Sequence, residues 1–446
     1  MTGPGPARAE ALNVLRLVRE GMPVNEALAR RTHEVTLSPS DRSLMAQLVY
    51  GVLRHRRYLD AWIDQYKRGN LEPDIEDILR MGFFQIGFLN RIPSYAVVHA
   101  AVEHAKLVQP RAAGLVNAIL RRGAVGPRPE PEDLGVRYSH PDWLVERWRQ
   151  RFGPDLERIL AEDNRVPPLT LRVNLERTTR EAVLEALERD GIRAEPSPYL
   201  PEGIRVSGSL WLEEWEPFRR GWVTVQDESG MLVTWVLDPQ PGESIIDLAA
   251  GLGGKATHVL ERLHGQGHVR AVDLSPHRIE LLRDNVARLG FASHISFEVN
   301  DARTAAARDP GRYDRVILDA PCSGLGVLRR RVDARWKKTL HDIHQLAGLQ
   351  LALFGAAVQA VRPGGVIVYS TCSVEPEETE EVVAQARHRW PGLAVEAVTP
   401  YLPHPALQGY VTPEGYLRLL PGDLGMDGFF IARLRAPAAA EEGGTL

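Results

Sequence analysis

The chain has 446 residues and a formal net charge of −4, and 44% of its residues are hydrophobic and 25% charged. That length exceeds one ordinary hydrophobic core, so we expect two or three globular domains. The apolar runs fall short of the roughly 18 residues that a spanning helix needs, and the N-terminus lacks the apolar centre of a signal peptide. We therefore expect a cytoplasmic protein without membrane segments.

The first predicted domain covers residues 1–125. Its apolar residues recur at spacings of three and four, which predicts helices throughout. The domain carries 17 Lys and Arg against 12 Asp and Glu, whereas the rest of the chain carries 37 against 46. We call residues 1–125 the head. A net positive head on a net negative remainder of the chain is compatible with RNA binding through the head, although a solvated basic face is the alternative.

Two smaller segments follow the head. Gly, Pro and acidic residues predict a linker at 126–135. Residues 136–235 mix a Trp-rich helical stretch with strand-like stretches such as LTLRVN and GWVTVQ. We interpret this segment as a small α+β domain of the RRM type.

Short apolar strands alternate with helices from 236 to 435. Strand and helix in alternation predict a doubly wound, Rossmann-like α/β domain, whose ligands bind at the carboxyl ends of the strands. Residues 436–446, rich in Ala, Glu and Gly, are predicted to be a frayed tail.

A glycine-rich loop follows the first strand of this domain, SIIDL. Its glycines let the backbone turn tightly beneath a helix N-terminus and approach a ligand closely. NAD, nucleotides and S-adenosylmethionine all bind to such loops, and a plain structural turn is a further alternative. The predicted cofactor-binding residues of the loop are Ala249, Ala250, Gly251, Leu252, Gly253, Gly254 and Lys255.

Acidic residues end the next two strands. Asp273 lies about 20 residues beyond the glycines, where a carboxylate can accept hydrogen bonds from both ribose hydroxyls of a cofactor. Asp301 follows the third strand and is placed to meet the adenine edge of the same ligand. An Asp in that position more often caps the next helix, and the two alternatives stay open.

Only two cysteines occur, Cys322 and Cys372, which excludes a disulfide scaffold. They follow the fourth and fifth strands, so both fall at the sheet edge where substrate binds. A lone cysteine is usually a small core residue, but two at this edge favour chemistry. No nearby His spacing completes a zinc site, so we expect no metal.

Thiols beside S-adenosylmethionine suit methylation at carbon 5 of cytosine. Because carbon 5 is a poor nucleophile, a thiolate that adds to carbon 6 converts the ring to an enamine able to attack the methyl sulfonium. Asp319, three residues before Cys322, would hydrogen-bond or protonate N3 and the amino group as charge develops. The residues alone do not order the two cysteines.

Residues 328–338, LRRRVDARWKK, carry six Lys and Arg and one acid. Contact with phosphates that flank the target is one interpretation, and an exposed charged loop is the other. Trp336 could stack on a base or anchor the loop.

These motifs resemble the Sun/NOL1/NOP2 family of RNA cytosine-C5 methyltransferases over nearly the whole chain. The head, with GLVNAILRR at 114–122, resembles the NusB-type domain that marks the bacterial RsmB-like branch of this family. The other matching motifs are NRVPPLTLRVN at 164–174, VQDESG at 225–230, DAPCSG at 319–324, DARW at 333–336, YSTCSV at 369–374 and DGFF at 427–430.

The resemblance implies a role for each predicted catalytic residue. Cys372 would be the nucleophile, and Cys322 would assist release of the methylated product. Asp319, whose role at the cytosine ring follows from the chemistry above, is also predicted to bind the cofactor. The cofactor loop departs from the family pattern, because Ala249, Gly251 and Leu252 replace Cys, Ala and Pro. We expect this change to loosen the loop.

The implied substrate is 16S ribosomal RNA, naked or in an early assembly intermediate, acted on by a monomer. Two alternatives remain. The first is a transfer RNA cytosine-C5 methyltransferase, and the second is a non-catalytic RNA-binding assembly factor whose altered loop has lost the cofactor.

Overall fold

The computed structural model describes residues 3, 5–208 and 210–438, which form two compact units. The first unit extends to Val166 and also contains Leu328–Lys337, and the second contains the remaining residues from Pro167 onward. Of the predicted tail at 436–446, residues 439–446 lie outside the described residues. Among the described helices, none combines the length and the apolar character that crossing a membrane requires.

The head consists of helices packed around α5 (Pro73–Phe88), which is buried over most of its length. A helix that is apolar on nearly all sides becomes the centre of a bundle. Gly82 on α5 admits Leu120, since a Cβ there would lie 2.7 Å from that side chain. The prediction of an all-helical head is confirmed. The other helices of the head are α1 (Pro6–Arg19), α2 (Val24–Glu34), α3 (Pro39–Arg54), α4 (Arg56–Asp64), α6 (Ser94–Val108) and α7 (Ala113–Val125).

The first unit continues beyond the head. The Trp-rich helix of the sequence is α9, and its Trp148 is fully buried within this unit. This helix therefore belongs to the same compact unit as the head. The predicted start of the small α+β domain at residue 136 stays a prediction. The further helices of the unit are α8 (Leu134–Arg137), α9 (Asp142–Phe152), α10 (Leu156–Glu162) and α17 (Ala334–Lys337).

A small α+β domain opens the second unit, as predicted. Its four strands are all antiparallel and lie in the order β2-β3-β1-β4, with β1 paired to both β3 and β4. The sequence predicts the strands LTLRVN and GWVTVQ but not the two between them. The elements are β1 (Leu169–Val173), α11 (Arg180–Arg189), β2 (Arg193–Pro196), β3 (Gly203–Ser207), α12 (Glu216–Arg219) and β4 (Val223–Val225).

The rest of the second unit is built on an eight-stranded sheet in the order β10-β12-β9-β8-β5-β6-β7, with β11 beside β12. Strands β5 to β9 are parallel, and β12 adds to β9 in the antiparallel sense. The order reverses between β5 and β8, so their carboxyl ends frame a crevice for ligands. The strands are β5 (Ser244–Asp247), β6 (His268–Asp273), β7 (Ile295–Val299), β8 (Tyr313–Asp319), β9 (Val361–Thr371), β10 (Ala394–Glu396), β11 (Leu417–Leu419) and β12 (Phe429–Arg435).

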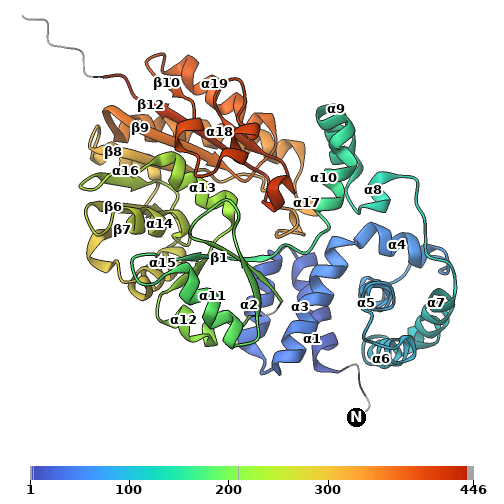
Figure 1. The fold of residues 1–446 in the computed structure, drawn as a ribbon. Helices are drawn as coiled ribbons and strands as arrows, with labels where there is room; N and C mark the ends of the chain where they lie inside the picture. The colour runs from blue at the N-terminus through green and yellow to red at the C-terminus, as the bar shows by residue number, and fades with distance from the viewer. Residues whose placement is uncertain (1–2, 4, 209, 439–446) are drawn as a thin grey trace, which may run out of the picture. The chain divides into compact units, whose positions relative to one another are not determined.

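Successive side chains of each strand point to opposite faces of this sheet, and each face packs in its own hydrophobic core. Ile317 of β8 faces one core, whereas its neighbours Val316 and Leu318 face the other. Helices cover both faces, which confirms the prediction of a doubly wound domain (Figure 1). One face carries α13 (Glu228–Leu237), α14 (Gly254–Arg262) and α15 (Pro276–Leu289), and the other carries α16 (Ala302–Arg308), α18 (Leu340–Ala360) and α19 (Glu380–Arg389).

Candidate active site

The glycine-rich loop connects β5 to α14 at the crevice. Gly251 and Gly253 both have positive φ, and a Cβ on Gly253 would lie 1.9 Å from Leu282. Only glycine fits there, because a side chain would meet both backbone strain and a packed neighbour. The amide of Gly251 donates to Asp273 at 2.9 Å, so the predicted loop and the predicted ribose acceptor lie together.

The loop and Asp273 lie together, as the predicted cofactor cradle requires. The carboxylate of Asp273 also accepts from the amide of Ser275 at 2.8 Å, which fixes it at the end of β6. Exposed Leu252 and Leu274 leave apolar surface next to these groups in the chain. Burial raises the pKa of Asp247, at the end of β5, to about 7.

Asp301 acts as a helix cap in this structure. Its carboxylate accepts from the amide of Arg303 at 2.8 Å and pairs with the Arg303 guanidinium at 2.6 Å. The hydrogen bond from Arg303 lowers the pKa of Asp301. The capping alternative is thereby confirmed, and contact with adenine stays a prediction for the remaining acceptor positions of this carboxylate.

Lys255, in the first turn of α14, forms an ion pair with Asp319 at 2.5 Å. The other oxygen of Asp319 accepts from the Ser370 hydroxyl at 2.8 Å. Burial disfavours the ammonium, but the charge and hydrogen bond of Asp319, together with the charges of Asp247 and Cys372, outweigh that effect and raise the pKa of Lys255. The sequence suggests Lys255 only as part of the cofactor loop, so its pairing with Asp319 is new.

The two cysteines meet at the ends of β8 and β9. Their sulfur atoms lie 3.2 Å apart, and both residues are thiols. The hydrogen bond with Cys372, together with burial, raises the pKa of Cys322 well above 9.0. The negative charges of Glu378 and Asp319 act in the same direction. Both thiols thus lie at the carboxyl ends of adjacent parallel strands, the edge at which the sequence predicts substrate to bind.

Arg172 of β1, which the sequence analysis missed, lies in the small α+β domain and holds α14, the helix that follows the glycine-rich loop. It is fully buried and donates to the Gly254 carbonyl at 2.6 Å, Thr257 at 2.9 Å and Glu261 at 2.8 Å. All three partners belong to α14, so this single guanidinium fixes the helix that begins at the glycine loop. The sequence did contain one sign of this role, because Arg172 is a charged residue within the otherwise apolar strand pattern LTLRVN.

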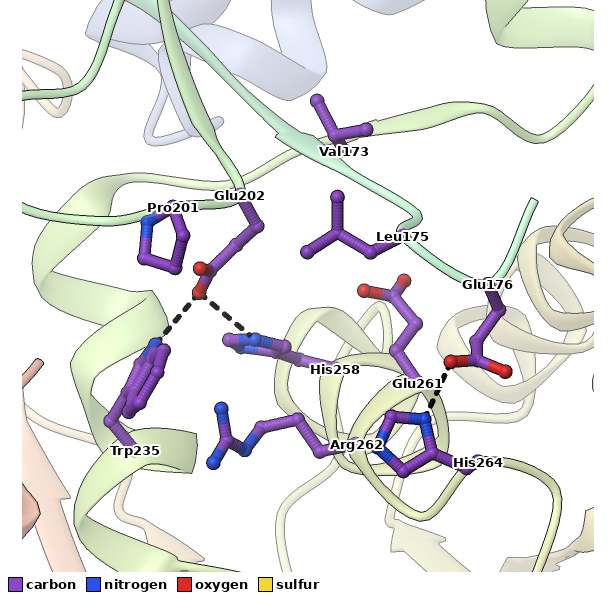
Figure 2. A pocket seen from close by; sticks show the side chains of 10 residues that line it. All are labelled: Val173, Leu175, Glu176, Pro201, Glu202, Trp235, His258, Glu261, Arg262 and His264. Atoms are coloured by element: carbon purple, nitrogen blue, oxygen red, sulfur yellow. Dashed lines mark hydrogen bonds and ion pairs between the residues drawn. The ribbon is translucent and has the colours of Figure 1, made fainter. Parts of the chain in front are cut away.

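A cavity of about 220 Å³ lies between the small α+β domain and the C-terminal end of α14, and Figure 2 shows its lining residues. Glu202 accepts from Trp235 at 2.8 Å and pairs with His258 at 3.2 Å. Burial lowers the pKa of His258 to about 4, so its ring is neutral at pH 7. None of the predicted site residues lines this cavity.

The basic segment at 328–338, for which phosphate contact and an exposed charged loop were the alternatives, is only partly exposed: Arg331 and Lys337 are exposed, and most of the other residues are buried. Arg335 is fully buried and donates to the carbonyls of Ser139 and Asp163, at 3.1 and 3.0 Å. The expectation of phosphate contact is therefore wrong for Arg335. The indole of Trp336 donates to the Leu53 carbonyl at 2.8 Å, which confirms the anchoring alternative.

Comparison with known proteins identifies the family. Residues 234–435 match the family described as 16S rRNA methyltransferase RsmB/F. The probable ribosomal RNA small subunit methyltransferase B of Synechocystis sp. is 36% identical, over 96% of this chain and 99% of its own length. The chain belongs to the RsmB/F methyltransferase family. The corresponding probable enzyme of Bacillus subtilis is 33% identical over 90% of this chain and 91% of its own.

Other parts of the chain match in the same way. Residues 6–124 match the NusB family, and residues 140–212 match the ferredoxin-like domain of RsmF/B-like methyltransferases. The crystal structure of PH0851 aligns with a TM-score of 0.81 and 26% identity, covering 96% of this chain and 99% of that one. These matches confirm the NusB-like head and the small middle domain, whose fold is ferredoxin-like.

The cofactor of this RsmB/F methyltransferase is S-adenosylmethionine, as predicted. The structure of NSun6 from Pyrococcus horikoshii, with the S-adenosylmethionine analogue SFG, aligns with a TM-score of 0.59 and 25% identity. That alignment covers 67% of this chain and 99% of the other.

Asp273→Asn tests the assignment of the cofactor cradle. We expect S-adenosylmethionine to bind about ten- to a hundredfold more weakly, because the amide group removes a charged acceptor and opposes an N–H donor. Calorimetric titration measures the change, and Asp284→Asn, at an exposed position of α15, is the matched control. Binding within twofold of the parent protein would place the cofactor elsewhere.

Proposed function

We propose that this protein transfers a methyl group from S-adenosylmethionine to carbon 5 of a specific cytosine in 16S ribosomal RNA. The observation that carries the proposal is the pair of thiols 3.2 Å apart at the ends of β8 and β9, beside the Lys255–Asp319 ion pair. Methyl transfer to oxygen or to an exocyclic nitrogen does not require a thiol, whereas carbon 5 of cytosine must first be activated by a nucleophile.

The charges around the two thiols support different roles for them. The thiolate form of Cys372 contributes to the field that raises the pKa of Lys255, so the Lys255 ammonium in turn favours that thiolate. Cys322 has the opposite surroundings, because the charges of Glu378 and Asp319 disfavour its ionisation. Cys372 is accordingly the nucleophile, and Cys322 is the thiol that hydrogen-bonds to it.

Addition is the first chemical step. The Cys372 thiolate forms a bond to carbon 6, the carbon 5–carbon 6 electron pair forms a carbon 4–carbon 5 double bond, and the carbon 4–N3 pair moves to N3. N3 takes a proton that the Lys255 ammonium supplies through its partner Asp319. Asp319, held by Lys255 and Ser370, is oriented to hydrogen-bond N3 and the amino group as this charge develops. S-adenosylmethionine supplies the electrophilic methyl group that carbon 5 then attacks.

Elimination completes the cycle. A water molecule accepts the proton of carbon 5, whose electron pair re-forms the carbon 5–carbon 6 double bond, and the electron pair of the bond from carbon 6 to the Cys372 sulfur returns to that sulfur. N3 returns its proton through Asp319 to Lys255. Cys322 assists this step from its position against the leaving sulfur. The free thiolate of Cys372 is then ready for another substrate.

Ribosomal RNA is the substrate class that the relatives favour, since the similar proteins are named for the small-subunit ribosomal RNA. The NusB-like head also supports ribosomal over transfer RNA. A purely non-catalytic RNA-binding role is disfavoured by the arrangement of Lys255, Asp319 and the two thiols around one crevice. RNA contact by the head stays a prediction, and exposed Arg121 and Arg122 on α7 remain available for it.

The test is methylation of defined RNA by the purified protein. 16S ribosomal RNA transcripts and 30S precursor particles are incubated with labelled S-adenosylmethionine, and nucleosides are identified by mass spectrometry. We expect 5-methylcytidine at one position, located by bisulfite sequencing. N4-methylcytidine or a ribose-methylated product would contradict the proposed chemistry, and methylation of transfer RNA alone would contradict the proposed substrate.

A further inference from the structure

The buried carboxylate of Glu378 links the two segments that follow β8 and β9 and carry Cys322 and Cys372, which we call the cysteine loops. Glu378 lies in a short helical turn, η5 (Pro376–Glu378), and is fully buried. One oxygen accepts from the amide of Ser323 at 2.8 Å, and the other accepts from the Ser323 hydroxyl at 2.5 Å. That second oxygen also accepts from the Ser373 hydroxyl at 2.5 Å. Ser323 follows Cys322 and Ser373 follows Cys372, so one side chain holds the residue next to each thiol.

The carboxylate is itself held by the surrounding elements. Gln350 of α18 donates to Glu378 at 3.1 Å and to the carbonyl of Pro321 at 2.9 Å. The hydroxyl of Tyr369 on β9 donates to the backbone carbonyl of Glu378 at 2.6 Å. Pro321 precedes Cys322, so the first cysteine loop is held on both sides of its thiol. A buried carboxylate with this many donors has little freedom to move.

We propose that Glu378 is a positioning residue that holds the Cys322 and Cys372 sulfurs together by accepting hydrogen bonds from the serines that follow them. A neutral amide of similar size cannot replace it, because Ser323, Ser373 and Gln350 all donate to its carboxylate. The inference rests on the proposed roles of the two thiols in nucleic-acid methylation. It goes beyond them in naming the group that sets the distance between the thiols.

A second effect of Glu378 is electrostatic. Its charge contributes to the raised pKa of Cys322, after the larger effects of the hydrogen bond with Cys372 and of burial. Cys322 thereby stays protonated and able to donate to the Cys372 thiolate. The same carboxylate thus has a geometric role and an electrostatic role, and the two can be measured separately.

The geometric role is tested by exchange with oxidised glutathione, in which the two protein thiols form a disulfide and two molecules of glutathione are released. The equilibrium gives the effective concentration of one thiol at the other. We expect Glu378→Gln to lower it about tenfold, because hydrogen bonds to a charged acceptor are lost. Glu381→Gln, at an exposed position of α19, is the matched control. A value within twofold of the parent protein would overturn the proposal.

The electrostatic role is tested in the Cys372→Ser background, where the rate of Cys322 alkylation is followed against pH. We expect the midpoint to move to lower pH in Glu378→Gln and to stay high in Glu378→Asp, which keeps the charge. An equal shift in both variants would indicate a merely structural role and overturn the proposal.

Both measurements are made without RNA, so they stand even if the methylated product is not 5-methylcytidine. Binding of S-adenosylmethionine shows that each variant is folded. Where Glu378→Gln fails that check, the double variant Ser323→Ala, Ser373→Ala removes hydroxyl donors without removing charge. An unchanged exchange equilibrium in this double variant would overturn the proposal.

Discussion

Cys372→Ala should abolish methylation, with a loss of at least about 10⁴-fold, because without the attacking thiolate the ring carbon cannot be activated. Binding of S-adenosylmethionine should be unchanged, since the predicted cradle of the glycine loop and Asp273 does not include Cys372. The variant should also form no covalent complex with RNA that survives denaturation.

The measurement combines a filter assay of methyl incorporation with a denaturing gel of labelled RNA. Cys372→Ser is the conservative comparison, and we expect it to be equally inactive, because a serine hydroxyl does not ionise near neutral pH as a thiol can. Methylation at more than about a hundredth of the parent rate in either variant would show that Cys372 is a packing residue.

Cys322→Ala should fail later in the reaction. Addition and methyl transfer can proceed through Cys372, but elimination loses the thiol that assists it. We therefore expect a covalent protein–RNA complex to accumulate when S-adenosylmethionine is supplied, visible as a slow band on a denaturing gel. Turnover should fall by about a hundredfold or more, the usual size of a general acid–base contribution.

The double variant Cys322→Ala, Cys372→Ala is the control, and it should give no slow band. A band from Cys372→Ala but not from Cys322→Ala would reverse the two roles. Full turnover by Cys322→Ala would show that the second thiol does not take part in the reaction.

Much of the fold follows from local sequence patterns. The alternation of strands and helices from residue 236 was predicted, because β5 to β9 are each a short apolar run bounded by turn residues. Strands β2, β3, β10 and β11 were missed. Strands β2 and β10 lie at sheet edges and β11 pairs only with β12, whereas β3 is an interior strand that is short and interrupted by Arg205.

The candidate site was predicted as a set of strand ends. Parallel strands of one sheet bring their carboxyl ends to the same edge, so the sequence could place the glycine loop, Asp273, Asp319 and both cysteines together. It could not order the cysteines. Their different charge surroundings arise from Lys255, which lies 117 residues from Cys372 in the chain, and from Glu378, which lies 56 residues from Cys322. Each of these pairs meets only in the folded domain.

The sequence by itself determined the helical head, the doubly wound sheet and the chemistry-bearing strand ends, because periodicity and turn residues act over a few positions. Only the tertiary structure decided which charges are exposed. Arg172 and Arg335 look like surface cations in the sequence, yet both are fully buried and bonded to groups more than 80 residues away in the chain, apart from the closer Gln226. A guanidinium becomes structural when distant carbonyls and carboxylates converge on it, and no local pattern records that convergence.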